Sequence, residues 1–500
     1  MGHPPGYPIL LAGIFKVAGE SDGAIQVVQV VCDAVAAVLL FLIALELVPA
    51  TAAIITGLLA AISPQFAYFS VVLLPDSLAV TPILAAVYFF LRGRKYKRTI
   101  NFVIAGALIG VSCWLRANAL LLAPFLALAA FLIVDRRMRL CAAAAIVAGA
   151  VVIIAPITIK NAFVFKRFIP VSLGAGQTLL EGISDFDESR RFNIPNTDLA
   201  IMRQEAEWYG KPEYARLLFG TDGIERERMR LRRGFAVIQS HPFWFAGVMA
   251  RRGADSTRLD PVPVLASESP VSYDFTRTQD GYTDDWLRIR GDETNYGLQH
   301  AWKTLSVKTN TDYVYYLPLK LEEGRVLVRI TDAGRSRILS SMGVDLIEGV
   351  PPPEQPNRTL AIPFVSAGES QVGLALANYA APNPVVNVGP GKLVELGPST
   401  YQWLRYVRIP IGIVQRIFRT AWMLPLVVLG LVLLMREREW TKLALIMMVP
   451  AYYLIVQSTL HTERRYVYVV HFFFLILAVH GVTRVLSLAR RKGRKHQTAG

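Results

Sequence analysis

The chain has 500 residues, of which 53% are hydrophobic and 18% are charged. This balance argues against a soluble protein of the same length and favours a chain that lies largely in lipid. The formal net charge of +15 does not indicate nucleic-acid binding, because Lys and Arg stand mostly in short runs at the ends of apolar segments.

The chain starts with "MGHPPGYPIL", and residues 1–20 lack the basic region, apolar stretch and Ala-x-Ala site of a secretory signal peptide. The paired prolines predict a turn, with a helix that begins near Tyr7. Three cysteines, Cys32, Cys113 and Cys141, fall inside apolar segments. We interpret them as small buried residues, since they offer neither a disulfide framework nor a CxxC metal site.

Apolar segments of membrane-spanning length recur along the chain. We predict nine spans, at about 24–47, 51–72, 76–91, 100–114, 117–134, 140–159, 410–435, 441–458 and 466–488. The basic runs at 92–98, 135–139, 436–439 and 490–495 all fall on one face of the membrane, which identifies that face as cytoplasmic. The protein is therefore expected to be integral to the cell (inner) membrane, with its N-terminus and large polar block extracytoplasmic and its C-terminus cytoplasmic.

The polar block between the sixth and seventh spans has two parts. In residues 183–260, apolar side chains recur on one helical face at Ile224, Leu231, Phe235 and Ile238, opposite the charged run "ERERMRLRR". This pattern predicts amphipathic helix at the membrane interface, broken at His241-Pro242. Residues 261–400 alternate, as in "GRVLVRITD", between Gly, Pro, Asn and Asp turns, which predicts a β-sandwich or jelly roll.

The predicted fold is thus a polytopic α-helical membrane protein with about nine spans and an inserted extracytoplasmic β-sandwich. Its domains are a membrane region at 1–182, a helical segment at 183–260, the sandwich at 261–400, and membrane helices with a basic tail at 401–500.

Unusual polar residues gather at the outer ends of the predicted spans. Asp76 follows a proline in "LLPDSLAV", where it is either a functional acid or a helix N-cap. Arg116 follows Trp114 at a span boundary, where it is either a functional cation or an interfacial anchor. Lys160 and Asn161 end the sixth span.

The segment "HTERRY" opens the ninth span with an outward pair of arginines, Arg464 and Arg465. Guanidinium groups bind phosphate through forked, charge-assisted hydrogen bonds, so an anionic head group or phosphate would explain their place. The alternative is a local ion pair with Glu463. The sequence has no nucleotide-binding glycine loop, zinc motif or serine nucleophile elbow. An enzyme of this kind would receive its activated substrate through the membrane, as a lipid-linked donor.

The motifs resemble, in order, those of the GT-C membrane glycosyltransferases, in the group of protein mannosyltransferases, aminoarabinose transferases and Rgt-like enzymes. The segments that carry the resemblance are "HPPGYPILLAGIFKVAG", "ISPQFAYFSVVLLPDSLAV", "GVSCWLRANALLLAP", "IIAPITIKNAFVFKRFIPVSLGAGQTLLEG" and "ERRYVYVVHFFFLILAVHGV".

The resemblance implies transfer of a sugar from a polyprenyl-phosphate donor to an extracytoplasmic glycan, lipid or protein, with inversion at the anomeric carbon. In the family, an aspartate in the first outer loop acts as the general base. Here the resemblance starts at His3, so we expect an N-terminally truncated member without the first helix and that aspartate.

The resemblance also assigns roles to single residues. Asp76 matches the second acidic, catalytic site. The expected donor-phosphate contacts are His3, Arg116, Lys160, Arg464 and Arg465, and the expected supporting residues are Tyr7, Asn161, Glu463 and Tyr466. The sandwich resembles inserted carbohydrate-binding modules. We expect no cofactor and no nucleic-acid partner; a divalent metal stays open, although Asp76 alone offers too few ligands.

Two other classes of protein compete with this hypothesis. A non-catalytic membrane protein would hold polyprenyl lipid in its helices and glycan in its sandwich. A transporter is less favoured, because the sequence shows no inverted repeat.

Overall fold

The computed structural model describes residues 2–259, 279–283, 286–294, 297–302, 304–347, 350–351, 354–379, 383–399 and 404–497. The chain divides into two compact units. One consists of Met1–Val262 with Gly412–Gly500, and the other, Pro263–Ile411, is inserted between these two stretches.

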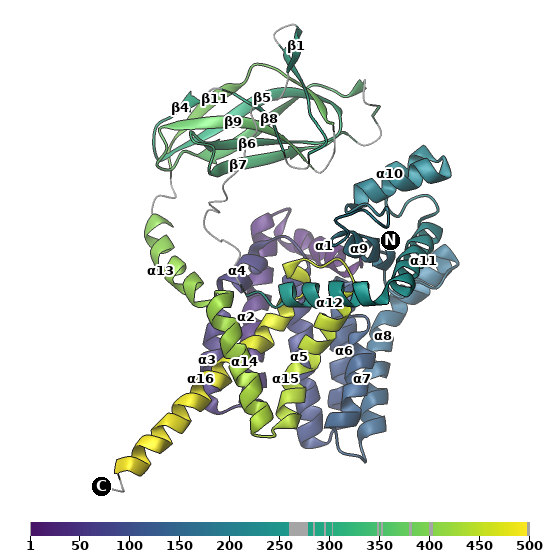
Figure 1. Ribbon diagram of the computed structural model, residues 1–500, viewed down its shortest axis with the longest axis vertical. Helices are drawn as coiled ribbons and strands as arrows, with labels where there is room; N and C mark the ends of the chain where they lie inside the picture. Colours follow the sequence, from purple (N-terminus) through teal and green to yellow (C-terminus); the bar gives the residue numbers. More distant parts are fainter. Residues whose placement is uncertain are drawn as a thin grey trace. The chain divides into compact units, whose positions relative to one another are not determined.

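The first unit is helical (Figure 1). In its N-terminal part the helices are α1 (Gly6–Ala18), α2 (Asp22–Leu47), α3 (Ala50–Ala61), α4 (Pro64–Val71), α5 (Asp76–Tyr96), α6 (Thr99–Leu115), α7 (Leu122–Ile133) and α8 (Arg139–Phe165). Then follow α9 (Ala175–Ser184), α10 (Asp198–Tyr209), α11 (Gly223–Ser240) and α12 (Pro242–Ser256). After the insertion come α13 (Leu404–Ile417), α14 (Thr420–Arg436), α15 (Trp440–Ser458) and α16 (Tyr468–Gln497).

Among the described residues, five helices are long and apolar enough to cross a membrane: α2, α5, α8, α15 and the Tyr468–Arg490 part of α16. Two bent pairs raise the number to seven, α3 with α4 and Pro410–Ile417 with α14. The spans predicted at 100–114 and 117–134 correspond to shorter apolar helices, Thr99–Leu115 and Ala117–Ile133. The prediction of a polytopic helical membrane protein is confirmed, and helices lie at all nine predicted positions.

The bend between α3 and α4 follows from the local sequence. Pro64 occupies the first turn of α4, where its missing N–H group would have no helical partner. The side chain of Ser63 caps the same helix by accepting a hydrogen bond from the backbone N–H of Phe66. These signals start a new helix 45° away from the preceding one.

Small residues let the spans approach closely. A Cβ atom on Gly106 of α6 would lie 1.9 Å from the carbonyl oxygen of Ile146 on α8. A Cβ atom on Gly149 of α8 would lie 2.2 Å from the carbonyl oxygen of Val103. The backbones of α6 and α8 therefore touch at these glycines, which is typical of helix packing in membranes.

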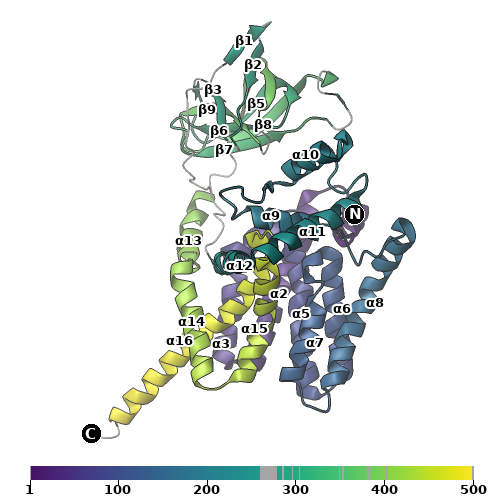
Figure 2. The same cartoon turned by 45° about the vertical axis from the view of Figure 1, so that its right-hand side comes forward.

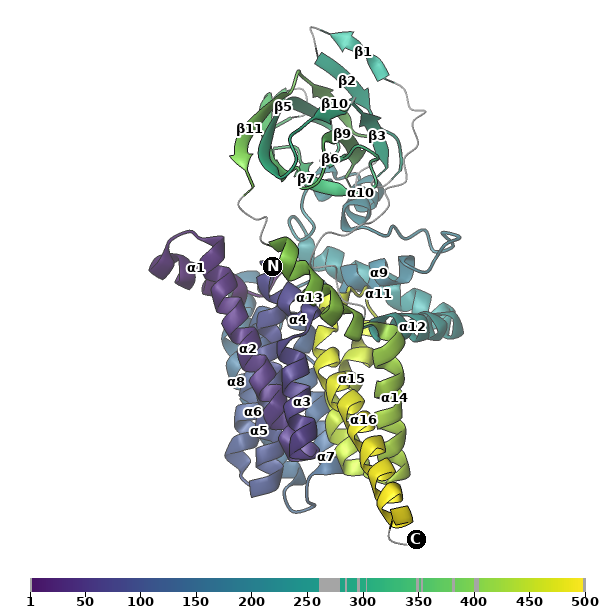
Figure 3. The same cartoon turned by 90° about the vertical axis from the view of Figure 1, so that its left-hand side faces the viewer.

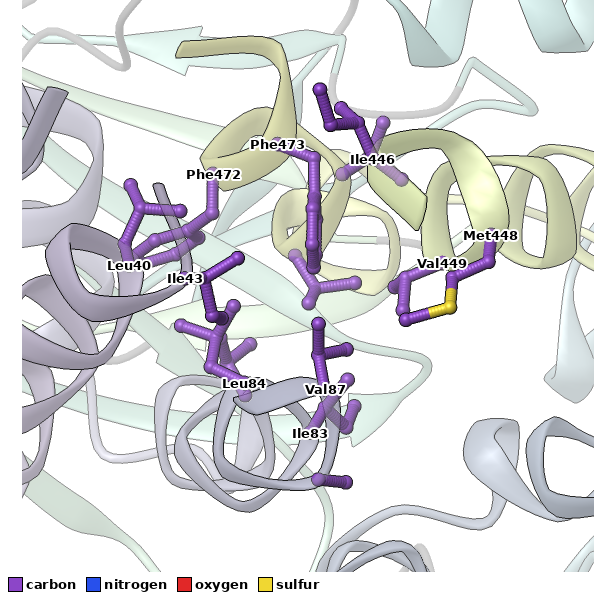
Figure 4. Close-up of a cluster of buried hydrophobic side chains, with 14 of the residues drawn as sticks. Leu40, Ile43, Ile83, Leu84, Val87, Ile446, Met448, Val449, Phe472 and Phe473 are labelled. Carbon is purple, nitrogen blue, oxygen red and sulfur yellow. The ribbon is translucent and has the colours of Figure 1, made fainter. Parts of the chain in front are cut away.

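The core of the bundle joins segments from both ends of the chain. Figure 4 shows Leu40 and Ile43 of α2 beside residues of α5, α15 and α16, all of them buried. The further side chains labelled there are Ile83, Leu84, Val87, Ile446, Met448, Val449, Phe472 and Phe473. Since α16 packs among the early spans, the loop before it lies near the outer ends of α4 and α5.

The bundle has two different ends. Helices α9, α11 and α12 lie across one end, whereas the C-terminal end of α16 lies at the other (Figures 1 and 3). At that second end, Lys97 pairs with Asp135 at 2.9 Å and Arg484 with Glu437 at 2.5 Å. Three of the basic runs predicted to share one face, 92–98, 135–139 and 436–439, thus lie at one end of the bundle.

The helical segment differs from its prediction in one respect. The break at His241-Pro242 is confirmed, because α12 begins at Pro242. The apolar residue Phe235, however, is 54% exposed, whereas the charged residues Arg226 and Arg230 of α11 are buried. The charged face of α11 is therefore not turned wholly to solvent, because Arg226 and Arg230 pack against a carboxylate on α10.

The cysteines also differ partly from their prediction. Cys113 is buried, Cys32 is partly buried and Cys141 is exposed. The expectation of three buried residues is therefore wrong for Cys141, because apolar helices of a membrane bundle also present small residues on their outer surface.

The second unit is a two-sheet sandwich of antiparallel strands (Figure 2). The strands are β1 (Gln279–Thr283), β2 (Trp286–Arg290), β3 (Leu298–Ala301), β4 (Leu305–Ser306), β5 (Thr311–Glu323), β6 (Val326–Asp332), β7 (Ile338–Val344), β8 (Arg358–Val365), β9 (Gln371–Asn378), β10 (Val385–Val388) and β11 (Lys392–Pro398). One sheet has the order β1-β2-β10-β5-β11 with β8 paired to β5, and the other β3-β9-β6-β7 with β4 paired to β9.

Alternation along β5 explains the packing of the sandwich. Tyr313, Tyr315, Leu317, Leu319 and Leu321 all point into the core, and the intervening residues do not. This period of two is the pattern from which the sandwich was predicted. The inserted β domain is confirmed.

Candidate functional site

A cavity of about 700 Å³ lies in the first unit where α4, α12 and the loop between α15 and α16 meet. We call it the donor cavity, after the lipid-linked donor that the sequence leads us to expect. One part of its lining is apolar and aromatic, from Tyr68, Phe69, Val72, Leu74, Phe186 and Val467. The polar part consists of Asp185, Arg252, Asp255, Ser256, Arg258, His461, Thr462, Glu463, Arg464 and Arg465. Two arginines of the predicted phosphate site are thus cavity residues.

Backbone hydrogen bonds fix the loop that carries these arginines. The backbone N–H of His461 donates to the carbonyl of Thr178 on α9 at 2.7 Å, and the hydroxyl of Thr462 donates to the carbonyl of Gln457 at 2.5 Å. A Cβ atom on Gly182 would lie 2.5 Å from the backbone nitrogen of His461. A glycine at this position therefore lets the loop pack directly on α9.

Arg252 connects three elements around the donor cavity. Its buried guanidinium donates to the carbonyl of Ser458 at 2.8 Å and to the carbonyl of Gly182, and it lies 3.6 Å from a carboxylate oxygen of Asp185. It therefore joins α12, α9 and the end of α15. Buried backbone carbonyls need such partners, so Arg252 holds the shape of the cavity.

His461 and Asp185 form a hydrogen-bonded pair on the cavity wall. Nδ1 of His461 lies 2.8 Å from Oδ2 of Asp185, and this contact raises the pKa of His461 above its usual value. A neutral His461 that donates from Nδ1 presents Nε2 as an acceptor. Nearby, burial raises the pKa of Glu181 to about 7, although Gln177 donates a hydrogen bond to its carboxylate.

Asp76 and Arg116 form a second cluster at this end of the bundle. Both Nε and Nη2 of Arg116 donate to Oδ1 of Asp76, at 2.9 Å and 2.5 Å, and only 3% of the Asp76 side chain is exposed. Asp76 makes no side-chain cap on α5, and its Oδ2 has no hydrogen-bond partner in the described structure. The side chain of Asp76 is therefore engaged by an ion pair rather than by a helix cap.

Tyr466 links Arg116 to the arginine loop. The guanidinium carbon of Arg116 lies 4.6 Å from the centre of the Tyr466 ring, and that of Arg465 lies 5.2 Å from the same centre. Arg465 also donates to Oε1 of Glu463 at 2.7 Å. Five residues predicted from the sequence thus lie together: Asp76, Arg116, Glu463, Arg465 and Tyr466. The local ion pair of Glu463, which was the alternative to a phosphate site, is present within this cluster.

The other predicted site residues lie elsewhere. His3 and Lys160 are exposed, and neither is among the described residues that line the donor cavity. Asn161 donates to the carbonyls of Ile169 and Val171, so it holds the turn after α8. Tyr7 donates to Gln29, which donates in turn to the carbonyl of the cavity residue Val72. Tyr7 is thus connected to the cavity through Gln29.

Sequence reasoning missed Asp185, Glu181 and Arg252 as members of this site. Asp185 stands 276 residues from its partner His461, and no local motif connects them. The one available signal was the position of His461 itself, beside the outward arginines. The described residues contain no group of three or more His, Cys, Asp or Glu side chains that could hold a metal ion.

The chain thus combines a helical membrane bundle, which holds an arginine-lined polar cavity, with an inserted β-sandwich. Residues 2–159 match the family model described as dolichyl-phosphate-mannose-protein mannosyltransferase. The resemblance predicted from the sequence is confirmed over these residues, and it supports glycosyl transfer from a polyprenyl-phosphate sugar donor. No curated protein and no solved structure matches the chain.

Proposed function

We propose that the protein transfers a sugar from a polyprenyl-phosphate donor to an extracytoplasmic glycan, lipid or protein, with inversion, and that the donor's sugar phosphate binds in the donor cavity. The observation that carries this proposal is the cavity's mixed lining, in which aromatic and apolar residues of α4 face an arginine loop. A polyprenyl phosphate likewise combines an apolar chain with a negatively charged phosphate.

The arginines would stabilise the leaving phosphate. Arg464 and Arg465 both line the cavity and carry guanidinium groups that suit phosphate oxygens. Negative charge on the phosphate grows as its bond to the sugar breaks, so cations placed beside it stabilise the transition state. Arg116 and Asp76 would act behind them, by holding the ring of Tyr466 between two guanidinium groups.

His461 would accept the proton of the acceptor hydroxyl at Nε2. The hydroxyl oxygen forms the new bond to the anomeric carbon, the carbon–oxygen bond to the phosphate breaks on the opposite face, and the configuration inverts. Asp185 keeps the proton on Nδ1 and stabilises the imidazolium that forms. Asp76, the second acidic residue expected from the sequence, would act indirectly through its ion pair with Arg116.

We place α9–α12 and the sandwich outside the cell and the C-terminus in the cytoplasm. The paired basic loops at the far end of the bundle support this orientation, since positively charged loops stay on the cytoplasmic side.

Binding and transfer in lipid nanodiscs test the proposal. With a panel of short-chain polyprenyl-phosphate hexoses, the Arg465→Gln variant should bind donor at least about tenfold more weakly. His461→Ala should bind donor normally but transfer sugar about 10²- to 10⁴-fold more slowly. Arg167→Gln is the matched control, because Arg167 is exposed and lies outside the cavity. A folded wild-type protein that binds no member of the panel would contradict the proposal.

The same assay separates the second candidate function, a non-catalytic protein that binds polyprenyl lipid and glycan. The observation that favours it is the engagement of Asp76 by Arg116, which leaves this acid no direct place on the cavity wall. Donor binding without release of polyprenyl phosphate, in the presence of cell-envelope acceptors, would support this alternative.

A further inference from the structure

A second cavity, of about 350 Å³, lies between α10 and α11 with α9 at its base. We call it the arginine cleft. Its lining consists of Leu180, Glu205, Trp208, Tyr209, Arg226, Met229, Arg230, Arg232 and Arg233, none of which lines the donor cavity. Figure 2 shows the three helices together in the first unit.

Most of the arginines share one helical face. Positions 226, 230 and 233 of α11 follow the spacing that brings side chains onto one side of a helix. Arg226 and Arg230 are buried, with 3% and 2% of their surface exposed. Because a buried charge is unfavourable unless it is paired, this face requires acidic partners.

The lining of the cleft has fewer carboxylates than arginines, and neutral carbonyl oxygens accept many of the remaining guanidinium N–H groups. Glu205 accepts from Nε of Arg226 at 2.8 Å, and from Nε and Nη2 of Arg230 at 2.6 Å and 2.8 Å. It is the one carboxylate among the described lining residues, against four arginines. Nη1 of Arg230 is buried without a hydrogen-bond partner, 3.6 Å from Oε2 of Glu227. The other oxygen of Glu227 accepts from two backbone N–H groups at the start of α9.

Aromatic side chains stand at the mouth of the cleft. Trp208 and Tyr209 are 53% and 47% exposed, which is unusual for such large rings in a polar segment. The guanidinium carbon of Arg233 lies 4.6 Å from the centre of the Trp208 ring. Exposed aromatic rings beside fixed guanidinium groups suit a ligand that combines an apolar sugar face with a negative charge.

We propose that the arginine cleft binds an anionic sugar, a saccharide that carries a phosphate or carboxylate, and that this sugar belongs to the acceptor. The second part rests on the proposed function and on the position of the cleft. Leu180 of α9 lies in the wall of the cleft, and Asp185, five residues further on, lies in the wall of the donor cavity. Five helical residues span about 8 Å, so one acceptor chain of a few sugars reaches both sites.

Saturation-transfer NMR with the full-length protein in neutral-lipid nanodiscs tests the site. The probes are mannose 6-phosphate, glucuronic acid and neutral mannose. We expect the two anionic sugars to bind and neutral mannose to bind at least tenfold more weakly. The double variant Arg232→Gln/Arg233→Gln should lose at least tenfold in affinity for the anionic sugars. Trp208→Leu should lose a similar factor in affinity for both mannose 6-phosphate and glucuronic acid. Arg228→Gln, on the exposed side of the same helix, should bind like the wild type.

Three outcomes overturn the proposal: a folded wild type that binds neither anionic sugar, equal binding by the double variant, or displacement of the sugars by nanodiscs that contain phosphatidylglycerol. The last outcome would identify a site for lipid head groups. A lipid-linked anionic glycan that binds more tightly than the free sugar supports the proposal and identifies a membrane-bound acceptor. Anionic sugar binding without any donor binding would preserve the cleft and refute the proposed function, so the two failures are distinguishable.

Discussion

In the donor cavity three arginines each have a carboxylate of their own nearby, whereas in the arginine cleft two buried arginines share Glu205, and Glu227 lies 3.6 Å from one of them. The cavity pairs are Arg252 with Asp185 at 3.6 Å, Arg258 with Asp255 at 3.1 Å, and Arg465 with Glu463 at 2.7 Å. Four arginines face three carboxylates in the cavity lining, and four face one in the cleft lining. The lining of the cleft therefore has a larger excess of positive charge than the lining of the cavity.

The two sites also differ in how deeply their ion pairs lie. Arg465 and Glu463 are partly exposed, so water and salt screen their interaction and the pair exchanges easily for a ligand. Arg226, Arg230 and Glu205 are buried, so their geometry is part of the fold. A partly exposed ion pair can open to bind a charged substrate and close again after it dissociates. A buried ion pair, in contrast, contributes a fixed electrostatic field.

Removal of Glu205 should produce the largest effect on stability. Glu205→Gln leaves the buried guanidinium of Arg226 without a negative partner and leaves Arg230 only Glu227, at 3.6 Å. Breaking a buried pair destabilises by about 3–5 kcal/mol. We expect a lower melting temperature and rapid proteolysis within residues 198–240. Glu207→Gln, an exposed acid on the same helix, is the control and should leave both properties unchanged. A loss below about 1 kcal/mol would show that water solvates the cleft and that its field is weak.

The wall of the donor cavity should lose stability as the pH rises. The pKa of Glu181 is raised from 4.5 to about 7 by burial, so the folded state holds a proton that the unfolded state releases. By linkage, the free energy of unfolding falls between about pH 4.5 and pH 7, by about 3 kcal/mol in total. His461 acts in the same direction, because its raised folded pKa gives stability that is present below pH 6.5 and lost above it.

Melting temperatures at pH 5, 6.5 and 8 test this dependence. The charged groups that act on Glu181 are His461, Asp198 and Asp185, and Gln177 donates to it. Glu181→Gln removes the titration and should leave only the smaller contribution of His461. A wild-type melting temperature that rises from pH 5 to pH 8 would contradict the assigned sign.

The pair between Asp76 and Arg116 should give an intermediate effect. Asp76→Ala removes two charge-assisted hydrogen bonds and destabilises by about 2 kcal/mol. Donor affinity should fall as well, because Arg116 no longer orients the ring of Tyr466. Asp22→Ala is the matched control, since Asp22 also begins a helix but is exposed. Unchanged donor binding in a folded Asp76→Ala variant would remove this pair from the site.

The membrane bundle follows from the sequence because its signals are local. Each predicted span is a continuous apolar run, and each basic loop lies where the run ends. The contact among Asp76, Arg116 and Tyr466 has the same basis, since polar residues at the ends of neighbouring apolar spans meet at one end of the bundle. The alternation of β5 predicted the sandwich by the same local logic.

The partners across long separations could not be predicted. Glu205 pairs with arginines that lie 21 and 25 residues away in the sequence. From sequence alone, a charged face of an amphipathic helix is typical of a face turned to solvent. Asp185 reaches His461 only because α9 packs on the loop before α16. Periodicity reports which residues share a face but not what covers that face. The packing partner of the charged face of α11 could therefore be identified only from the structure.

Glu463 should give the smallest effect on stability and the clearest contrast with Glu205. Its pair with Arg465 is partly exposed, so Glu463→Gln should change the free energy of unfolding by less than about 1 kcal/mol. Donor affinity should rise about threefold to fivefold, because the carboxylate no longer competes with the phosphate for the guanidinium. Titration of the lipid-phosphate donor into nanodiscs measures this change, and the gain should shrink in 0.5 M salt, which screens the removed repulsion.

Glu395→Gln provides the control for the Glu463 variant. Glu395 also forms a partly exposed ion pair, with Lys308, but it lies on β11 in the inserted unit. It should alter neither stability nor donor affinity. Weaker donor binding by Glu463→Gln would mean that Glu463 orients Arg465 toward the phosphate and does not compete with it. The donor cavity would then depend on a fixed arginine, as the arginine cleft does, and the contrast between exchangeable and permanent charge would fail.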